Sequence, residues 1–194
     1  MGYFIGIELS AENKAQAVAA QDLLRNDFPE VTWLTDEQLF CVLCYFPVDK
    51  ESKIAFNLRA AEKTLIEIGA NVAPILISLS TPGCFPATGP ARVAWIGIGE
   101  VEPQHGMLER LVSETGKLMA RDFAAKGELI PHIPIGRASD RAPKKDLRKR
   151  ASSLAIAGNP QEVARIALIE SSQGHKGPVY KTVKSAELSA QFWG

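Results

Sequence analysis

The sequence is poor in residues that mark several functional classes. Among 194 residues there are 3 cysteines and 3 histidines, and 22 Lys and Arg balance 22 Asp and Glu. A small, odd number of cysteines argues against a disulfide framework, and zero net charge argues against general attraction to nucleic acid. No apolar run reaches membrane-spanning length, and the chain starts directly with a strand pattern instead of a signal peptide. We therefore expect a cytoplasmic protein that does not bind membranes.

The cysteines do not form an evident metal or redox motif. Cys41 and Cys44 lie in the apolar run of residues 39–46, which reads as a strand. Residues three apart on a strand point to opposite faces, so the two thiols are not expected to share a ligand. We predict no metal and no cofactor.

The positive charges are unevenly distributed. Residues 137–150 hold seven Lys and Arg against two Asp, a net charge of +5, which leaves −5 for the rest of the chain. Such a segment can contact a phosphate backbone, but it is also typical of a solvated loop.

Hydrophobic periodicity predicts an α+β protein. Apolar stripes at helical spacing indicate helices over residues 11–26, 49–68 and 104–126. Alternating or continuous apolar runs indicate strands over residues 3–9, 39–46, 74–80, 92–98, 131–137, 163–171 and 179–188, with a loop over 81–90. The halves share a layout of strand, long helix and strand. We expect one domain, residues 1–194, of two interleaved lobes, with antiparallel sheets around a central groove and helices outside.

The segment of residues 131–137 carries the clearest candidate site. On a strand, His132, Pro134 and Gly136 share one face, while Ile133 and Ile135 suit a core. Imidazole exchanges a proton near neutral pH, and the guanidinium of Arg137, which closes the strand, can hold phosphate oxygens. The alternative is a half-exposed strand histidine without chemistry.

Several segments share their order and spacing with a known family. They comprise residues 3–9, 33–46, 83–86, 91–95, 131–137 and 176–180. Through them the chain resembles the 2H phosphoesterases, most closely the RNA 2′,3′-cyclic phosphodiesterase or 2′-5′ RNA ligase family. The resemblance implies two His-x-Thr/Ser-x motifs facing each other across a groove. One histidine would activate water, the other would protonate the leaving ribose oxygen, and the hydroxyls would hold the phosphate oxygens.

The sequence departs from this pattern at most of the motif positions. Phe40 stands where the resemblance implies the first histidine, and Val42 stands where it implies the first threonine. In the second motif His132 is present and Pro134 replaces the threonine, while Arg137 matches the arginine that ends the motif. We therefore expect His132 as the catalytic candidate. The predicted phosphate or substrate contacts are Arg137, Phe40, Val42, Pro134 and Tyr180.

Three functions stay open. The first is a weakly active or inactive family member that binds RNA ends or 2′,3′-cyclic nucleotides, as a monomer. In it, Phe40 either stacks on a base or merely fills the groove together with Val42. The second is an active phosphodiesterase in which His132 is the single acid or base. The third is a protein-interaction module that keeps only the fold. His105, His175, Cys41 and Cys44 are not expected to replace the missing histidine.

Overall fold

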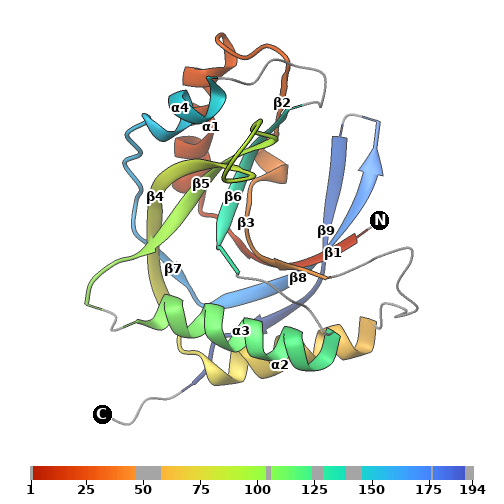
Figure 1. Ribbon diagram of the computed structural model, residues 1–194. Helices are drawn as coiled ribbons and strands as arrows, with labels where there is room; N and C mark the ends of the chain where they lie inside the picture. Colours follow the sequence, from red (N-terminus) through yellow and green to blue (C-terminus); the bar gives the residue numbers. More distant parts are fainter. Residues whose placement is uncertain are drawn as a thin grey trace.

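The chain folds into one curved sheet with helices on its outer side (Figure 1). The computed structural model describes residues 2–46, 58–103, 106–123, 129–138, 146–175 and 177–190. In these ranges the helices are α1 (Ala11–Arg25), the one-turn helix η1 (Asp36–Gln38), α2 (Leu58–Asn71), α3 (Met107–Phe123) and α4 (Leu147–Ser152). The strands are β1 (Gly2–Glu8), β2 (Val31–Trp33), β3 (Phe40–Tyr45), β4 (Ile75–Phe85), β5 (Val93–Glu100), β6 (His132–Ala138), β7 (Gln161–Val163), β8 (Arg165–Gly174) and β9 (Gly177–Glu187).

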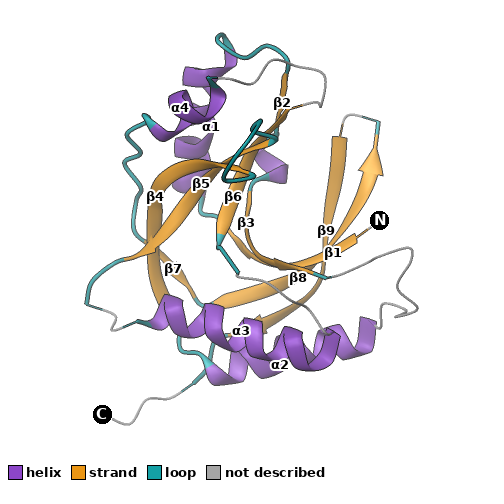
Figure 2. Ribbon diagram, viewed as in Figure 1, coloured by secondary structure: helices purple, strands orange, loops and turns teal. Residues whose placement is uncertain are grey.

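The sheet has nine strands in the order β7-β4-β5-β6-β3-β1-β8-β9, with β2 paired to β6. Every pairing among the described strands is antiparallel. Figure 2 shows the strands curling into a half-barrel with the helices outside it. The predicted α+β class is confirmed. The strands that we assigned to two lobes join into one continuous sheet.

The two faces of the sheet bury different side chains, because successive residues on a strand point in opposite directions. The main core lies under the helices and includes Ile5, Cys41 and Leu43. Their neighbours Phe4 and Phe40 belong to a second, small apolar cluster on the other face, whose remaining members are Val42, Ala167 and Ile169. This second cluster, on the face of the sheet opposite the main core, is the base on which the candidate site is built.

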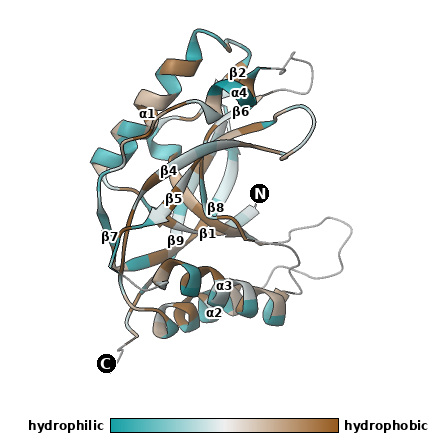
Figure 3. Ribbon diagram, turned by 60° about the vertical axis from the view of Figure 1, so that its left-hand side comes forward, coloured by the Kyte–Doolittle hydropathy of each residue, from teal (hydrophilic) through white to brown (hydrophobic). Residues whose placement is uncertain are grey.

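The helices form because their sequences carry an apolar stripe and suitable ends. The Ser10 side chain accepts a hydrogen bond from the Asn13 backbone N–H and so caps α1. Hydrophobic and hydrophilic residues alternate along α2 and α3, which pack side by side (Figure 3). Arg121 of α3 forms an ion pair with Glu67 of α2. None of the described helices is long and apolar enough to cross a membrane.

The structure differs from the sequence prediction at β4, at α4 and at the short elements β2, η1 and β7. Strand β4 continues through Thr81–Phe85, which we had assigned to a loop, and Pro82 fits there because the β4–β5 register shifts beside it. Helix α4 lies within the basic segment, and β2 had not been predicted. The predicted helical residues 49–57, 104–105 and 124–126 lie outside the described residues.

Candidate functional site

A cavity of about 570 Å³ opens between β6 and the β8–β9 hairpin, on the sheet face away from the helices. One wall comes from β4, β5 and β6 and consists of Phe85, Val93, His132, Pro134 and Arg137. The other wall comes from β3, β8 and β9 and consists of Tyr45, Ser171, Gln173, Pro178 and Tyr180. The cavity therefore combines a histidine, an arginine and two tyrosines with several apolar surfaces.

The orientation of His132 is set by one hydrogen bond and two rings. Its Nδ1 lies 2.7 Å from the carbonyl oxygen of Ile130. A carbonyl only accepts, so Nδ1 carries the proton and Nε2 is the free acceptor of the neutral ring. The imidazole packs edge-to-face against Phe85 at 4.9 Å and lies 6.3 Å from the Trp95 ring. These contacts leave the ring one bonded nitrogen and one nitrogen available as a base.

The environment of His132 favours its neutral form. Burial lowers its pKa below the ordinary histidine value, the hydrogen bond to Ile130 partly opposes this, and the nearby charge of Arg137 lowers it further. A neutral imidazole at pH 7 can accept a proton but has none to give from Nε2.

A β-bulge in β6 turns Arg137 into the cavity. Strict alternation would place Arg137 on the opposite face from His132. The β5–β6 register shifts between the pairs Ala94–Gly136 and Trp95–Pro134, which leaves Ile135 as an extra residue. Residues after the bulge therefore change face, and Arg137 joins His132 in lining the cavity. A Cβ on Gly136 would meet side chains on the face of the sheet that carries the main core. Our expectation that Gly136 shares the face of His132 is therefore wrong.

The bulge is held from behind by a buried amide. Nε2 of Gln21, in α1, donates to the carbonyl oxygens of Leu34 and Ile135, at 2.8 Å each. Gln21 is 1% exposed, so these bonds do not compete with water. Helix α1 thus fixes the strand geometry on which the direction of Arg137 depends.

Tyr180 stands on the opposite wall. Its ring packs edge-on against Phe4 at 5.2 Å and Phe40 at 5.9 Å. Burial raises its pKa, the neighbouring Tyr45 raises it further, and the positive charge of Arg137 partly opposes both. The positive charge of Arg137 therefore acts on both Tyr180 and His132.

Phe40 and Val42 lie under this wall. Both are buried, at 8% and 3% exposure, in the small apolar cluster against which Tyr180 packs. Val42 pairs with His132 across the β3–β6 ladder. The structure thus brings His132, Pro134, Arg137 and Tyr180 together at the cavity surface, with Phe40 and Val42 beneath it.

Comparison with known proteins identifies the family. No protein-family model matches the chain. An RNA 2′,3′-cyclic phosphodiesterase of Archaeoglobus fulgidus is 30% identical over 153 residues, which cover 78% of this chain and 80% of that protein. The chain belongs to the RNA 2′,3′-cyclic phosphodiesterase family.

Solved structures of the same 2H phosphoesterase-like fold superpose over nearly the whole chain. TT0787 of Thermus thermophilus matches with a TM-score of 0.76 at 23% identity, covering 99% of this chain and 100% of that one. Escherichia coli LigT complexed with 3′-AMP matches with a TM-score of 0.65 at 18% identity, covering 97% of this chain and 98% of that one. The curled antiparallel sheet of this chain is therefore the fold that these solved structures share.

The sequence of this chain did not reveal the whole cavity wall. Tyr45, Ser171 and Gln173 were not singled out, although they line the cavity. Phe85 and Trp95, which hold the His132 ring, lie in segments that carry the family resemblance. A signal for them was present, because aromatic residues in those two segments fall on paired strands beside the His132 strand.

Other candidates from the sequence lie away from the cavity or outside the described residues. His175 is exposed in the β8–β9 turn and does not line the cavity, and His105 is outside the described ranges. Burial raises the pKa of Cys44 to about 12 and that of Cys41 still further, so both thiols stay protonated. In the part of the chain that the structure describes, no three His, Cys, Asp or Glu side chains gather in a metal-binding group.

Two of the three described basic residues of α4, Arg148 and Arg150, have structural partners. Arg148 donates to the carbonyl oxygens of Pro86 and Gly89, at 2.6 and 3.0 Å. Arg150 forms an ion pair with Asp27 at 3.0 Å. Arg141, Lys144 and Lys145 lie outside the described residues.

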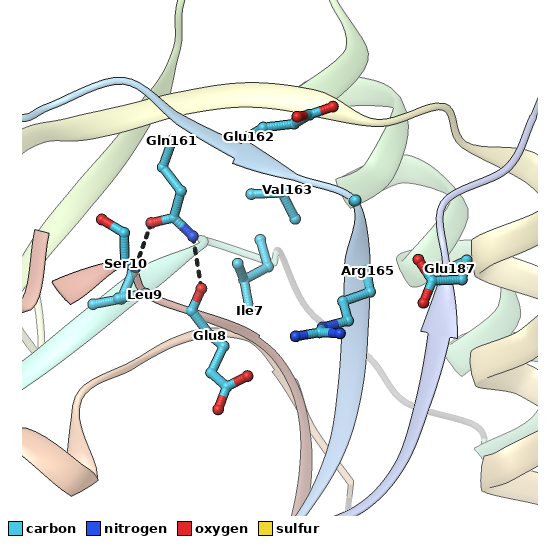
Figure 4. Close-up of a pocket in the computed structure, with 10 residues that line it drawn as sticks. Ile7, Glu8, Leu9, Ser10, Gln161, Glu162, Val163, Arg165 and Glu187 are labelled. Atoms are coloured by element: carbon cyan, nitrogen blue, oxygen red, sulfur yellow. Dashed lines mark hydrogen bonds between the residues drawn. The ribbon is translucent and has the colours of Figure 1, made fainter. Parts of the chain in front are cut away.

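A second cavity of about 330 Å³ lies where β7 passes into β8 (Figure 4). Gln161 closes one side of it, because its Oε1 accepts from the Ser10 N–H at 2.8 Å and its Nε2 donates to the Glu8 carbonyl at 2.7 Å. Arg165 extends toward the middle of this cavity in Figure 4. The described residues of its lining include no histidine and no tyrosine, which are the proton-transfer groups of the first cavity.

Proposed function

We propose that the protein binds RNA ends or nucleotides that carry a 2′,3′-cyclic phosphate, in the cavity of His132, Arg137 and Tyr180, and that it turns them over slowly or not at all. The observation that carries the proposal is the convergence of Arg137 with one neutral histidine in a partly apolar cavity. The family's curated members are named for RNA 2′,3′-cyclic phosphodiesterase activity, which supports the substrate class.

The cavity suits a nucleotide for chemical reasons. A guanidinium binds phosphate oxygens through two parallel hydrogen bonds. Tyr45 is 47% exposed at the cavity and Phe85 lies across from it, so each offers a ring on which a base can stack. Phosphate recognition would thus come from Arg137 and base recognition from the aromatic walls.

Slow turnover follows from the motif residues. One proton-transfer group contributes about 10²–10⁴ in rate and one oxyanion donor about 10²–10³. Phe40 has no proton to transfer, and neither Val42 nor Pro134 has a hydroxyl to hold a phosphate oxygen. A site in which His132 is the one motif residue left therefore lacks a second proton-transfer group and both hydroxyl donors, and its turnover should be slow.

The test is calorimetric titration with 2′,3′-cyclic AMP and with a short RNA ending in a 2′,3′-cyclic phosphate, with product followed in the same samples. Arg137→Gln should weaken binding by about 10-fold or more, because a hydrogen bond to a charged group contributes about 1.5–3 kcal/mol. Lys181→Gln is the matched control, since it also removes one positive charge but faces away from Tyr180 on β9.

The outcomes separate the three candidate functions. Binding that Arg137→Gln weakens and Lys181→Gln preserves supports the proposal. Equal effects of the two substitutions point to a general charge effect and contradict it. An absence of binding favours a protein-interaction module that keeps only the fold.

A second candidate is an active phosphodiesterase with an altered mechanism. The bond from Nδ1 of His132 to the Ile130 carbonyl favours it, because this bond presents a neutral Nε2 that can accept a proton from water. Rapid product formation that is lost in His132→Asn would establish this candidate in place of the slow one.

A further inference from the structure

Tyr180 occupies the space above the motif position that lacks a histidine. The side chain at that position, Phe40, is buried and its ring contacts the edge of Tyr180, whose centroid is 5.9 Å away. Tyr180 in turn lines the cavity that His132 lines from the opposite wall. The first group that a ligand meets on this side of the cavity is therefore a phenol, in place of the imidazole that the family pattern implies.

Arg137 connects the two groups. It lines the cavity together with both of them, and its positive charge lowers the pKa of each. A phosphate held by Arg137 would thus lie between an imidazole and a phenol. In-line displacement at phosphorus needs a base and an acid on opposite sides of the phosphate, and this arrangement supplies one on each wall.

We propose that Tyr180 is the proton donor to the leaving ribose oxygen in whatever hydrolysis this protein performs, a role that the family pattern gives to a histidine. The inference rests on the proposed binding of a 2′,3′-cyclic phosphate in this cavity. It makes Tyr180 and His132 a complementary acid and base.

The step balances without a further reactant. Water attacks phosphorus and gives one proton to Nε2 of His132. The bond from phosphorus to one ribose oxygen breaks, and that oxygen takes the proton of the Tyr180 hydroxyl. The product is a ribose phosphomonoester. The proton on His132 then returns to the Tyr180 phenolate through water, which restores both groups.

The protonation states agree with these roles. Burial keeps Tyr180 protonated at neutral pH, and a phenol can still protonate a ribose alkoxide because the alkoxide is the stronger base. Burial keeps His132 neutral and therefore able to accept a proton. Pairs of groups whose environments separate their pKa values in this way are typical of acid and base partners.

Tyr180 fits the role better than the other polar groups of the cavity. Tyr45 is 47% exposed and packs on Phe4, without a contact to Phe40 among the ring contacts of the described residues. A guanidinium such as that of Arg137 offers hydrogen-bond donors only and does not serve as a general acid in proteins. Ser171, directly across the β8–β9 ladder from Tyr180, carries an aliphatic hydroxyl that is a much weaker acid than a phenol.

The test compares Tyr180→Phe with Tyr3→Phe. Each substitution removes one phenolic hydroxyl and keeps the ring, but the Tyr3 hydroxyl bonds Glu170 and does not line the cavity. Turnover of 2′,3′-cyclic AMP is measured over hours with concentrated enzyme, alongside the binding of 2′,3′-cyclic AMP and 3′-AMP. We expect Tyr180→Phe to reduce kcat by about 10²-fold or more while the two Kd values change by only a few-fold, and Tyr3→Phe to leave both unchanged.

Each result decides the inference. Loss of kcat with binding retained in Tyr180→Phe supports it. Turnover that survives in Tyr180→Phe overturns it. Binding by the wild-type protein without any product also overturns it, but leaves the proposed binding function intact. An absence of binding by the wild-type protein overturns both.

Discussion

At the residue scale, His132 should make ligand binding and catalysis respond to pH in opposite directions. Its pKa lies below the ordinary histidine value, so the ring is neutral at pH 7. As the pH falls through that pKa, the ring gains a positive charge beside Arg137, and a phosphodiester anion should bind more tightly. Hydrolysis needs the neutral ring, so its rate should fall over the same range. Titration of 2′,3′-cyclic AMP binding and turnover between pH 5 and pH 8 measures both effects.

His132→Asn should remove this pH dependence. The amide keeps a hydrogen-bonding group but has no charge to gain in this range. His175→Asn is the control, because His175 is exposed in the hairpin turn and does not line the cavity. If tight binding at low pH persists in His132→Asn, another group binds the proton and our assignment of the cavity histidine fails.

At the same scale, the sequence predicted identities better than directions. His132 and Pro134 line the cavity, as alternation along the strand indicates. The direction of Arg137 could not be derived, because it depends on the extra residue at Ile135 and on the space that Gly136 leaves beside Trp33. A bulge depends on how a strand packs against other elements, so the apolar pattern of one short strand does not predict where a bulge occurs.

At the scale of elements, helix α1 controls the cavity through Gln21. Gln21→Leu should lower the free energy of unfolding by about 1–3 kcal/mol, because the buried Leu34 carbonyl loses its amide donor. The Ile135 carbonyl still accepts a hydrogen bond from the Leu34 backbone N–H, at 3.0 Å. The bulge should therefore become less rigid without being lost. We therefore also expect a few-fold weaker binding of 2′,3′-cyclic AMP, as Arg137 loses its fixed direction. Urea unfolding and calorimetric titration measure the two effects.

The control for this prediction is Gln16→Leu. It makes the same chemical change on the same helix at a half-buried position one and a half turns earlier. Its unfolding free energy should stay within about 0.5 kcal/mol of the wild type. Equal effects of the two substitutions would mean that helix packing in general, and not the bond to the bulge, determines stability here.

The hairpin is a second element whose position could not be read from the sequence. Gln38 of η1 donates to the Pro178 carbonyl at 2.6 Å, two residues before Tyr180. This bond spans 140 residues of sequence and joins two separate segments of the family resemblance, which local periodicity does not relate to each other. Periodicity predicted both strands of the hairpin, but only the folded chain shows that η1 holds its tip beside the cavity.

At the scale of the whole molecule, the fold class followed from the sequence and the continuity of the sheet did not. Alternating runs and apolar stripes predicted the strands and helices of the α+β class. They could not predict that β8 pairs with β1 or that β7 pairs with β4. In both pairings a strand from the C-terminal part of the chain contacts a strand from its first half. Such pairings depend on which edges remain open after the local strands have formed.

The charge of the whole molecule leads to the last prediction, a shallow dependence of RNA binding on salt. The net charge is zero, and among the described residues that line the cavity Arg137 is the one Lys or Arg. Of the described basic residues of α4, Arg148 and Arg150 are already bound to carbonyls and to Asp27, which leaves the exposed Lys149. Single-stranded RNA releases counterions with a slope of about −0.7 in log K against log salt for each phosphate contacted. We therefore expect a slope of about −0.7 to −1.4 for a short RNA with a 2′,3′-cyclic end, measured by titration between about 50 and 200 mM KCl.

A matched measurement on 2′,3′-cyclic AMP gives this prediction its control. The mononucleotide carries only the phosphate that Arg137 is proposed to bind, so its slope and that of the RNA should be nearly equal. A slope of about −3 or steeper for the RNA alone would mean that several more phosphates are contacted. The basic segment of residues 137–150 would then be part of the RNA surface, and recognition would extend along the strand instead of ending at its terminal phosphate. Equal slopes would instead restrict recognition to the cavity, because a molecule without net charge has no other general attraction for RNA.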